Sequence, residues 1–280
     1  MENNSKSKVI KGLILVGGFG TRLRPLTFTK PKPLVEFCNS PTLTYQLEAL
    51  VKIGVTEVVL AINYQPDKMY EFIKFAEEKY GIKIICSIET EPLGTAGPIG
   101  LAKNNILMIS QIDELIVFNA DITCKYPLAD LVNFHRNHGK EGTIMVTRVK
   151  EPSRYGVIVT DESNKILRFE EKPLEFISNK INAGIYLFSK EFLSRIEAVP
   201  TSIEREIFPS MASDGQLYAM DLEGFWMDIG QPRDFLIGSI MYLENLKQYE
   251  REDKQLVSGR NIRGNCLIVY FNIKQLGFDC

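Results

Sequence analysis

The stretch that decides the fold of this 280-residue chain is Gly17-Gly18-Phe19-Gly20-Thr21-Arg22-Leu23-Arg24-Pro25-Leu26-Thr27. It follows an apolar run over residues 9–16, which predicts a buried strand. Glycine tolerates positive φ and has no Cβ, so a glycine-rich turn lets successive backbone N–H groups converge on an anion. Arg22 and Lys32 add positive charge beside the turn. The pattern predicts a triphosphate site on a parallel α/β sheet, and therefore an enzyme.

The spacing excludes the commonest phosphate-binding loops. A P-loop requires Gly-Lys-Ser/Thr after its glycines, whereas Thr21 and Arg22 follow Gly20 here. The dinucleotide fingerprint requires Gly or Ala three residues after Gly20, where this chain has Leu23. Together with Pro31-Lys32-Pro33-Leu34-Val35, the string therefore indicates a different class of nucleotide site.

Strands and helices alternate along the first half of the chain. Strand-like runs cover residues 9–16, 57–62, 82–88 and 115–119, and helical patterns cover 42–53, 67–80, 99–109 and 128–138. Such alternation predicts right-handed βαβ units and a mostly parallel sheet with helices on both faces. We therefore expect a Rossmann-like three-layer α/β sandwich that binds its ligands at the carboxyl ends of the strands.

The second half of the chain is richer in short strands. Residues 143–149, 157–160, 166–169 and 185–188 are strand-like and are joined by short turns. Short connections predict antiparallel pairs, so we expect the sheet to be mixed rather than purely parallel. Residues 232–248 return to a helical pattern.

The composition of the chain indicates which classes of binding partner are unsuited to it. The formal net charge is −2, so neither a nucleic acid nor a membrane surface is indicated as a partner. No apolar run approaches the roughly 20 residues that span a bilayer, and the polar first residues lack the apolar core of a signal peptide. The five cysteines are scattered without a Cys-X-X-Cys pair, which indicates reduced thiols and a cytoplasmic protein.

Two aspartates are candidate metal ligands. Asp121 follows the apolar run at 115–118, and Asp228 lies between an aromatic-rich run and Gly230. A carboxylate at the carboxyl end of a strand faces the ligand crevice, although a lone Asp there is more often a turn residue or a helix cap. Two such carboxylates suit one hard cation, as in the Mg²⁺ sites of phosphoryl-transfer enzymes. We therefore expect Mg²⁺ as the cofactor.

The glycine turn, Pro31-Lys32-Pro33-Leu34 and the two aspartates together resemble the sugar-1-phosphate nucleotidyltransferases. The closest resemblance is to the mannose-1-phosphate guanylyltransferases of the catalytic beta type, over about residues 10–265. It implies that mannose-1-phosphate attacks the α-phosphorus of GTP, giving GDP-mannose and pyrophosphate. It implies catalytic roles for Arg22, Lys32 and Lys172, with Mg²⁺ on Asp121 and Asp228. The implied nucleotide-binding residues are Leu15, Gly17, Gly18, Gly20, Thr21, Glu89, Gly94, Thr95 and Asp121.

The sugar side is also implied by the resemblance. By composition alone, Glu170-Glu171-Lys172-Pro173 is a solvated turn ended by a proline. It resembles the GluLysPro motif of the family, in which the lysine contacts the sugar phosphate and the glutamate a sugar hydroxyl. The implied sugar-binding residues are Gly156, Glu171, Lys172 and Asn182.

Glu89 carries the prediction of the base. Related enzymes for uridine or thymidine nucleotides have a glutamine five residues before the glycine that matches Gly94. A carboxylate is an acceptor only, so Glu89 suits the N1–H and N2–H donors of guanine. Thr95 and the backbone at Gly94 would complete the recognition. The plainer interpretation of Glu89 is a solvated loop carboxylate.

The chain departs from the resemblance at its end. Family members of this type continue into a left-handed β-helix of hexapeptide repeats, whereas residues 266–280 lose that pattern. We expect a polar tail at 1–8, a nucleotidyltransferase domain at 9–249, and a linker with a short, truncated β-helix remnant at 250–280. We expect either a homo-oligomer or a complex with a related regulatory subunit.

Two alternatives stay open from sequence. One is a transferase of the same fold for another pair, such as UTP or ATP with glucose-1-phosphate. The other is a non-catalytic regulatory subunit that binds GDP-mannose. Glu89 argues against the uridine pair, and the presence of Arg22, Lys32, Asp121, Lys172 and Asp228 argues against the regulatory subunit.

Overall fold

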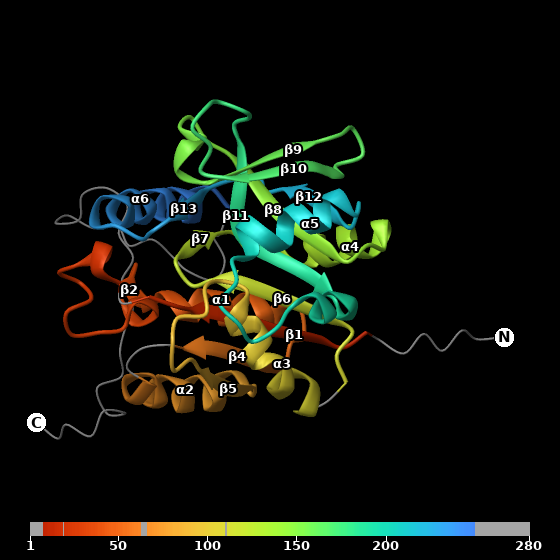
Figure 1. Cartoon of the computed structure of the whole chain (residues 1–280). Coiled ribbons are helices and arrows are strands. Elements are labelled where there is room, and N and C mark those ends of the chain that lie inside the picture. The colour runs from red at the N-terminus through yellow and green to blue at the C-terminus, as the bar shows by residue number, and fades with distance from the viewer. Residues whose placement is uncertain (1–7, 19, 63–65, 110, 250–280) are drawn as a thin grey trace, which may run out of the picture.

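The structure, a computed structural model, describes residues 8–18, 20–62, 66–109 and 111–249 (Figure 1). Its centre is a mixed sheet of nine strands. One half of the sheet is parallel and has the strand order β6–β1–β4–β5. These strands are Glu114–Asn119, Ile10–Val16, Glu57–Ile62 and Lys83–Ile88. Because they are parallel, their carboxyl ends meet at one edge of the sheet.

The other half of the sheet is built around β11 (Lys180–Ser189), which pairs antiparallel with β6. The opposite edge of β11 pairs with β8 (Gly142–Arg148). At Ile181, on the edge away from β8, β11 also pairs at one position with β9 (Gly156–Thr160). β10 (Ile166–Glu171) extends β9 antiparallel, and β12 (Leu217–Asp221) extends β8 parallel. The expected antiparallel pairs in the second half are therefore confirmed.

Helices cover both faces of the sheet, because alternate side chains of each strand point to opposite faces. Ile14 of β1 belongs to a buried cluster that includes residues of α1 (Thr42–Lys52), α2 (Pro66–Tyr80) and α4 (Leu128–His138). Its neighbour Leu13 belongs to a second cluster, with residues of α3 (Gly97–Ile109) and α5 (Phe208–Ser213). This arrangement confirms the three-layer sandwich. No helix of the described residues is both long and apolar enough to cross a membrane.

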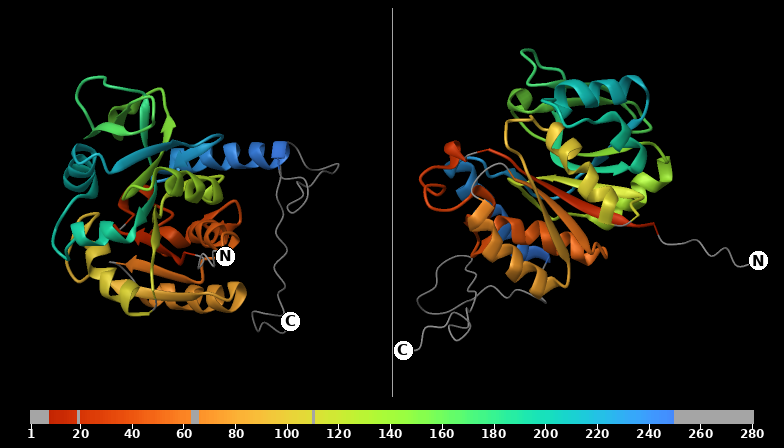
Figure 2. Two further views of the ribbon diagram at one scale, coloured as in Figure 1. Left: turned by 90° about the vertical axis from the view of Figure 1, so that its right-hand side faces the viewer. Right: turned by 60° about the horizontal axis from the view of Figure 1, so that its bottom comes forward.

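The last described helix, α6 (Pro232–Tyr249), lies at the side of the molecule (Figure 2). It is held by an aromatic cluster in which Tyr242 meets Phe37 of β2 (Glu36–Phe37) and Tyr45 of α1, with ring centroids 5.7 and 5.4 Å apart. The strand before it, β13 (Trp226–Asp228), pairs antiparallel with β7 (Ile122–Cys124). This pairing brings the end of β13 beside the turn that follows β6.

Most expected elements agree with the structure to within a few residues. The strand expected at 185–188 is wrong at its start, since β11 begins at Lys180. Its pairing with β8 shifts register between Asn182 and Tyr186, and Gly184 has φ +73°, which interrupts the alternation that marks a strand. The sequence also misses β2, β3 (Ser40–Pro41), β7 and β12, which are short. The extension predicted at 250–280 and residues 1–7 of the tail lie outside the described residues.

Candidate active site

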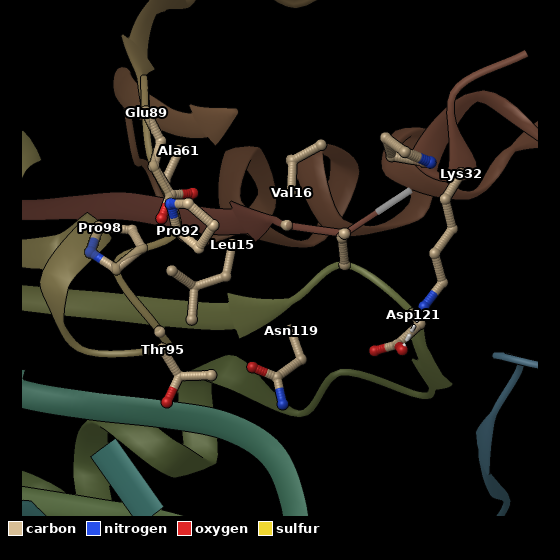
Figure 3. Close-up of a pocket in the computed structure, with 15 residues that line it drawn as sticks. Leu15, Val16, Lys32, Ala61, Glu89, Pro92, Thr95, Pro98, Asn119 and Asp121 are labelled. Carbon is tan, nitrogen blue, oxygen red and sulfur yellow. Dashed lines mark hydrogen bonds and ion pairs between the residues drawn. The ribbon is translucent and has the colours of Figure 1, made fainter. Parts of the chain in front are cut away.

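A cavity of about 420 Å³ opens at the carboxyl ends of β1, β4 and β6 (Figure 3). β1 and its turn, Ala61 of β4 and the turn after β6 form one part of its lining, and the loop at 89–98 forms another. The predicted nucleotide residues line the cavity, with the exceptions of Gly20 and Thr21. Those in the lining are Leu15, Gly17, Gly18, Glu89, Gly94, Thr95 and Asp121, joined by Lys32. The nucleotide residues predicted from three separate segments thus meet in one cavity.

The glycine turn closes on itself at Gly20. This residue has φ +61°, and its carbonyl accepts hydrogen bonds from the Thr27 hydroxyl at 2.7 Å and from the Leu23 N–H at 3.0 Å. A Cβ on Gly20 would lie 2.9 Å from Cγ2 of Thr27, so only glycine fits. Thr21 and Arg22 follow on an exposed 3₁₀ turn. Gly20 therefore shapes the turn, while Gly17 and Gly18 face the cavity.

Two cations and two carboxylates gather beside the cavity. The Lys32 ammonium lies 2.5 Å from Oδ2 of Asp121 (Figure 3). A Cβ on Gly230 would lie 2.8 Å from Oδ1 of Asp228 and 3.7 Å from both Nη2 of Arg22 and Oδ2 of Asp121. Gly230 thus lies next to the side chains of Arg22, Asp121 and Asp228. Because it has no side chain, these three groups can approach one another. The predicted cations of the triphosphate site and the predicted metal ligands form one cluster.

Backbone hydrogen bonds hold the two aspartates together. The Ile229 N–H donates to the Asp121 carbonyl at 2.9 Å, and the Gly230 N–H donates to Oδ1 of Asp228 at 2.8 Å. Burial, and then the negative charge of Asp121, raises the pKa of Asp228 from 3.8 to about 6, against the opposing charges of Lys32 and Arg22. The cluster therefore favours a further positive charge next to Asp228.

The donor chemistry of this cluster fits a hard divalent cation. Asp121 and Asp228 supply oxygen ligands only, which is the preference of Mg²⁺. Across the described ranges, no group of three or more His, Cys, Asp and Glu side chains forms a metal cage. A cation held by two carboxylates would complete its coordination with water and phosphate oxygens, as Mg²⁺ commonly does at phosphoryl-transfer sites.

The loop at 89–98 forms one wall of the cavity. Oε1 of Glu89 accepts from the Leu93 N–H at 2.5 Å, and the Glu89 N–H donates to the Ile62 carbonyl at 2.8 Å. Glu89 is therefore half-buried and braces the loop, which differs from a freely solvated carboxylate. Gly94, with φ +76°, lets the loop press against Thr201, whose carbonyl oxygen would be 2.5 Å from a Cβ.

The predicted sugar-side residues form a second group. Glu171 pairs with Gly156 across β9 and β10, and a Cβ on Gly156 would lie 2.9 Å from Oε2 of Glu171. The exposed Lys172 ammonium lies 3.3 Å from Oε1 of Glu171. Burial raises the pKa of Glu171, the charge of Lys172 opposes this rise, and the charge of Glu204 adds to it.

Asn182 makes two hydrogen bonds within β11. Its Nδ2 donates to the Tyr186 hydroxyl at 2.9 Å, and its Oδ1 accepts from the Gly184 N–H at 2.9 Å. The amide thus stabilises the irregular part of β11. Tyr186 also receives a long hydrogen bond, 3.5 Å, from Nδ2 of Asn119 in the cavity lining. A contact between Asn182 and a sugar stays a prediction.

Sequence reasoning missed several residues of the site. Ala61, Asn119 and Ala120 line the cavity at strand ends, where the carboxyl-end rule for parallel sheets points to them. Pro92 and Pro98 line the wall formed by the loop at 89–98. Glu204 accepts a hydrogen bond from the Thr95 hydroxyl at 2.6 Å, and no pattern in the sequence indicates this contact.

The fold and this cluster define a nucleotidyltransferase, and residues 11–245 match the family of nucleotidyl transferases. The chain is 57% identical over 260 residues to probable mannose-1-phosphate guanylyltransferase 1 of Oryza sativa subsp. japonica. It is 56% identical over 260 residues to mannose-1-phosphate guanylyltransferase catalytic subunit beta of Dictyostelium discoideum. Each match covers 92% of this chain and 71% of the relative. The chain belongs to the mannose-1-phosphate guanylyltransferases, as the sequence motifs predicted.

Solved structures agree with the fold. HddC from Yersinia pseudotuberculosis, crystallised with GMP-PN, is similar with a TM-score of 0.67 and 27% identity, covering 83% of this chain and 99% of HddC. A putative glucose-1-phosphate thymidylyltransferase from Bacillus anthracis shares the fold with a TM-score of 0.71 and 23% identity, over 82% of this chain and 94% of that protein.

Proposed function

We propose that this chain transfers GMP from GTP to mannose-1-phosphate and thereby forms GDP-mannose and pyrophosphate. The observation that carries the proposal is the cluster of Arg22, Lys32, Asp121 and Asp228 beside the cavity, in a chain that shares more than half its residues with guanylyltransferases. The regulatory alternative has no use for such a cluster, since a sensor that performs no transfer gains nothing from a metal site.

The proposed reaction is an in-line displacement at phosphorus. An oxygen of the sugar phosphate forms a bond to the α-phosphorus of GTP, and the bond from that phosphorus to pyrophosphate breaks. The attacking phosphate is already ionised at neutral pH, so no protein nucleophile or base is required. Rate enhancement comes from positioning and from stabilising charge on the phosphoryl oxygens.

The residues of the cluster have separable roles in this reaction. N–H groups of the glycine turn bind the phosphates, Arg22 and Lys32 hold the triphosphate and stabilise the leaving pyrophosphate, and Lys172 orients the incoming sugar phosphate. Asp121 and Asp228 would hold Mg²⁺. When bound, that ion neutralises phosphate charge and helps to align the reacting oxygens.

The proposed specificity residues form a base side and a sugar side. Oε1 of Glu89 is used by the Leu93 N–H, so Oε2 is the oxygen we assign to the donors of guanine. Thr95 and Gly94 form the adjoining wall. On the sugar side, Glu171 accepts from a sugar hydroxyl and Gly156 allows the close approach.

The proposal also covers the assembly, the domain bounds and the cellular location of the enzyme. Relatives are named catalytic subunit beta, which supports assembly of this chain with further subunits or copies. Residues 9–249 form the proposed catalytic domain, and the family match at 11–245 supports these bounds. Cys86 and Cys124 are thiols outside any disulfide, which supports a cytoplasmic location.

The test is pyrophosphate release with Mg²⁺ across GTP, ATP, UTP and dTTP, each offered mannose-1-phosphate or glucose-1-phosphate. We expect turnover with GTP and mannose-1-phosphate, and its loss in Asp121→Ala. Turnover with another pair would overturn the assigned substrates. Binding of GDP-mannose without turnover of any pair would overturn the enzymatic assignment and favour the regulatory one.

A further inference from the structure

The start of α3 packs directly against the backbone of residues 197–201. A Cβ on Gly94, Gly97 or Gly100 would lie 2.5, 2.4 and 2.3 Å from the carbonyl oxygens of Thr201, Val199 and Glu197. The N–H groups of Thr95 and Ala96 both donate to the Thr201 carbonyl, at 3.1 and 3.0 Å. With glycine at each contact, no side chain separates the two segments, so they form one closely packed unit.

Glu204 lies at the end of this unit, on a single π-helical turn over Ile203–Ile207. Its Oε2 accepts from the Thr95 hydroxyl at 2.6 Å and from the Ser202 hydroxyl at 3.1 Å. The Thr95 hydroxyl in turn accepts from the Ile203 N–H at 2.9 Å. Thr95 lines the nucleotide cavity, and its side chain is therefore fixed both as a donor and as an acceptor by the turn that carries Glu204.

The turn that carries Glu204 packs against β10, the strand that ends at Glu171. The charge of Glu204 contributes to the raised pKa of Glu171, after burial, and to that of the buried Tyr186 hydroxyl, again after burial. Tyr186 receives hydrogen bonds from Asn182 and from Asn119. Glu204 thus stands between the loop that binds the nucleotide and the residues predicted to bind the sugar.

We infer that Glu204 is a positioning residue that couples the nucleotide loop to the sugar pocket, through its hydrogen bond with Thr95 and the packing of its turn against β10. Its role rests on the proposed function, because it presumes that two substrates meet here. Removal of the Thr95 hydroxyl, which lies on the nucleotide side, is expected to weaken binding of the sugar phosphate as well.

The test is a kinetic double-mutant cycle with Thr95→Val and Glu204→Ala. Valine keeps the shape of threonine but cannot donate, and a hydrogen bond to a charged group is worth a factor of roughly ten or more. We expect Thr95→Val to raise the KM for mannose-1-phosphate about tenfold, and the double variant to be no worse than Glu204→Ala. Thr95→Ser, which retains the hydroxyl, should restore the KM.

Glu206→Gln is the matched control on the same turn. Oε1 of Glu206 accepts from the Ser202 N–H at 2.8 Å, so this variant weakens the turn locally without touching Thr95. We expect it to lower Tm without changing the KM for mannose-1-phosphate. If Thr95→Val raises the KM for GTP alone, or if the two effects multiply in the double variant, the coupling role is overturned while the proposed function stands. A wild-type chain that turns over no substrate pair overturns the proposed function instead.

Discussion

Lys32 and Asp121 form an ion pair of 2.5 Å between residues 89 positions apart in sequence. Both side chains are largely buried, at 15% and 20% exposed. The lysine proposed for the triphosphate thus neutralises a carboxylate proposed for the metal.

Replacement of Lys32 by methionine tests its role. We expect kcat/KM to fall on the order of a hundredfold or more, because a positive charge beside the phosphates is lost. We also expect Tm to fall, since Asp121 loses its partner and faces Asp228 without this cation. Lys32→Arg is the control that keeps the charge, and we expect it to recover Tm more than activity. Full activity of Lys32→Met would contradict the assignment.

We expect the ionised carboxylate of Asp228 to lower the stability of the folded protein when no metal is bound. Its pKa is raised from 3.8 to about 6 in the folded state, so between these values the folded chain binds more protons than the unfolded chain. Stability is therefore lost as pH rises through 6. Asp228→Asn cannot ionise, and at pH 8 in a chelator it should raise Tm by a few degrees while abolishing turnover. A lower Tm at pH 8 would show that the carboxylate is stabilising instead.

Glu89→Gln tests the assigned base contact. Glutamine retains an oxygen for the Leu93 N–H but replaces the second acceptor with a donor. We expect the ratio of kcat/KM for GTP over UTP to fall at least tenfold, with little change in Tm. Leu93→Ala, which retains the N–H, is a control for the loop itself. Unchanged GTP selectivity in Glu89→Gln would reduce Glu89 to a brace of the loop.

Two histidines are expected to set the acid stability. His135 and His138 both approach the buried Thr143 hydroxyl, at 2.8 and 2.7 Å, and burial lowers the pKa of each from 6.5 to about 4. The unfolded chain binds more protons between these values, so stability falls as pH falls from 6.5 to about 4. Urea midpoints at pH 7 and pH 4.5 would measure this loss.

His138→Phe is the informative variant for that pH dependence. The ring of His138 stacks on Tyr218 at 4.3 Å, and phenylalanine retains this stacking but cannot titrate. We expect His138→Phe to be less stable than wild type at pH 7 but to lose less stability on acidification. An equal loss in both proteins would place the acid sensitivity elsewhere.

The sequence predicts the parallel half of the fold well because strands there are long and apolar. β4 runs from Glu57 to Ile62, as expected, since its core positions form a continuous apolar run bounded by polar residues. β7 escapes prediction because three residues carry no periodicity, whereas the aromatic run before Asp228 indicates β13 but not its pairing with β7. Their pairing depends on tertiary contacts such as the bond from Trp226 Nε1 to the Ala183 carbonyl, at 2.9 Å.

The site residues likewise divide into those that local sequence motifs predict and those that depend on tertiary packing. Lys32 and Asp121 belong to recognisable motifs, and the carboxyl-end rule suffices to bring them together. Glu204 lies in a stretch, Pro200-Thr201-Ser202-Ile203-Glu204, that resembles the family, but the stretch alone assigns it no contact. Its contact with Thr95 depends on how residues 197–201 pack on α3. The hydrogen bonds that Asn182 makes with Tyr186 and Gly184 likewise depend on a register shift in β11, which a single sequence does not reveal.

The position of β11 in the sheet determines how this protein responds to truncation. One edge of this strand pairs with β6 of the parallel half and, at one position, with β9, and the other edge pairs with β8. A fragment that stops before β11 would leave one edge of β6, whose centre is apolar and buried, unpaired and would open both buried clusters to water. The two halves of the sheet are therefore not separable modules. They should melt together in one cooperative transition, and splitting the chain ahead of β11 should yield pieces that aggregate when expressed alone.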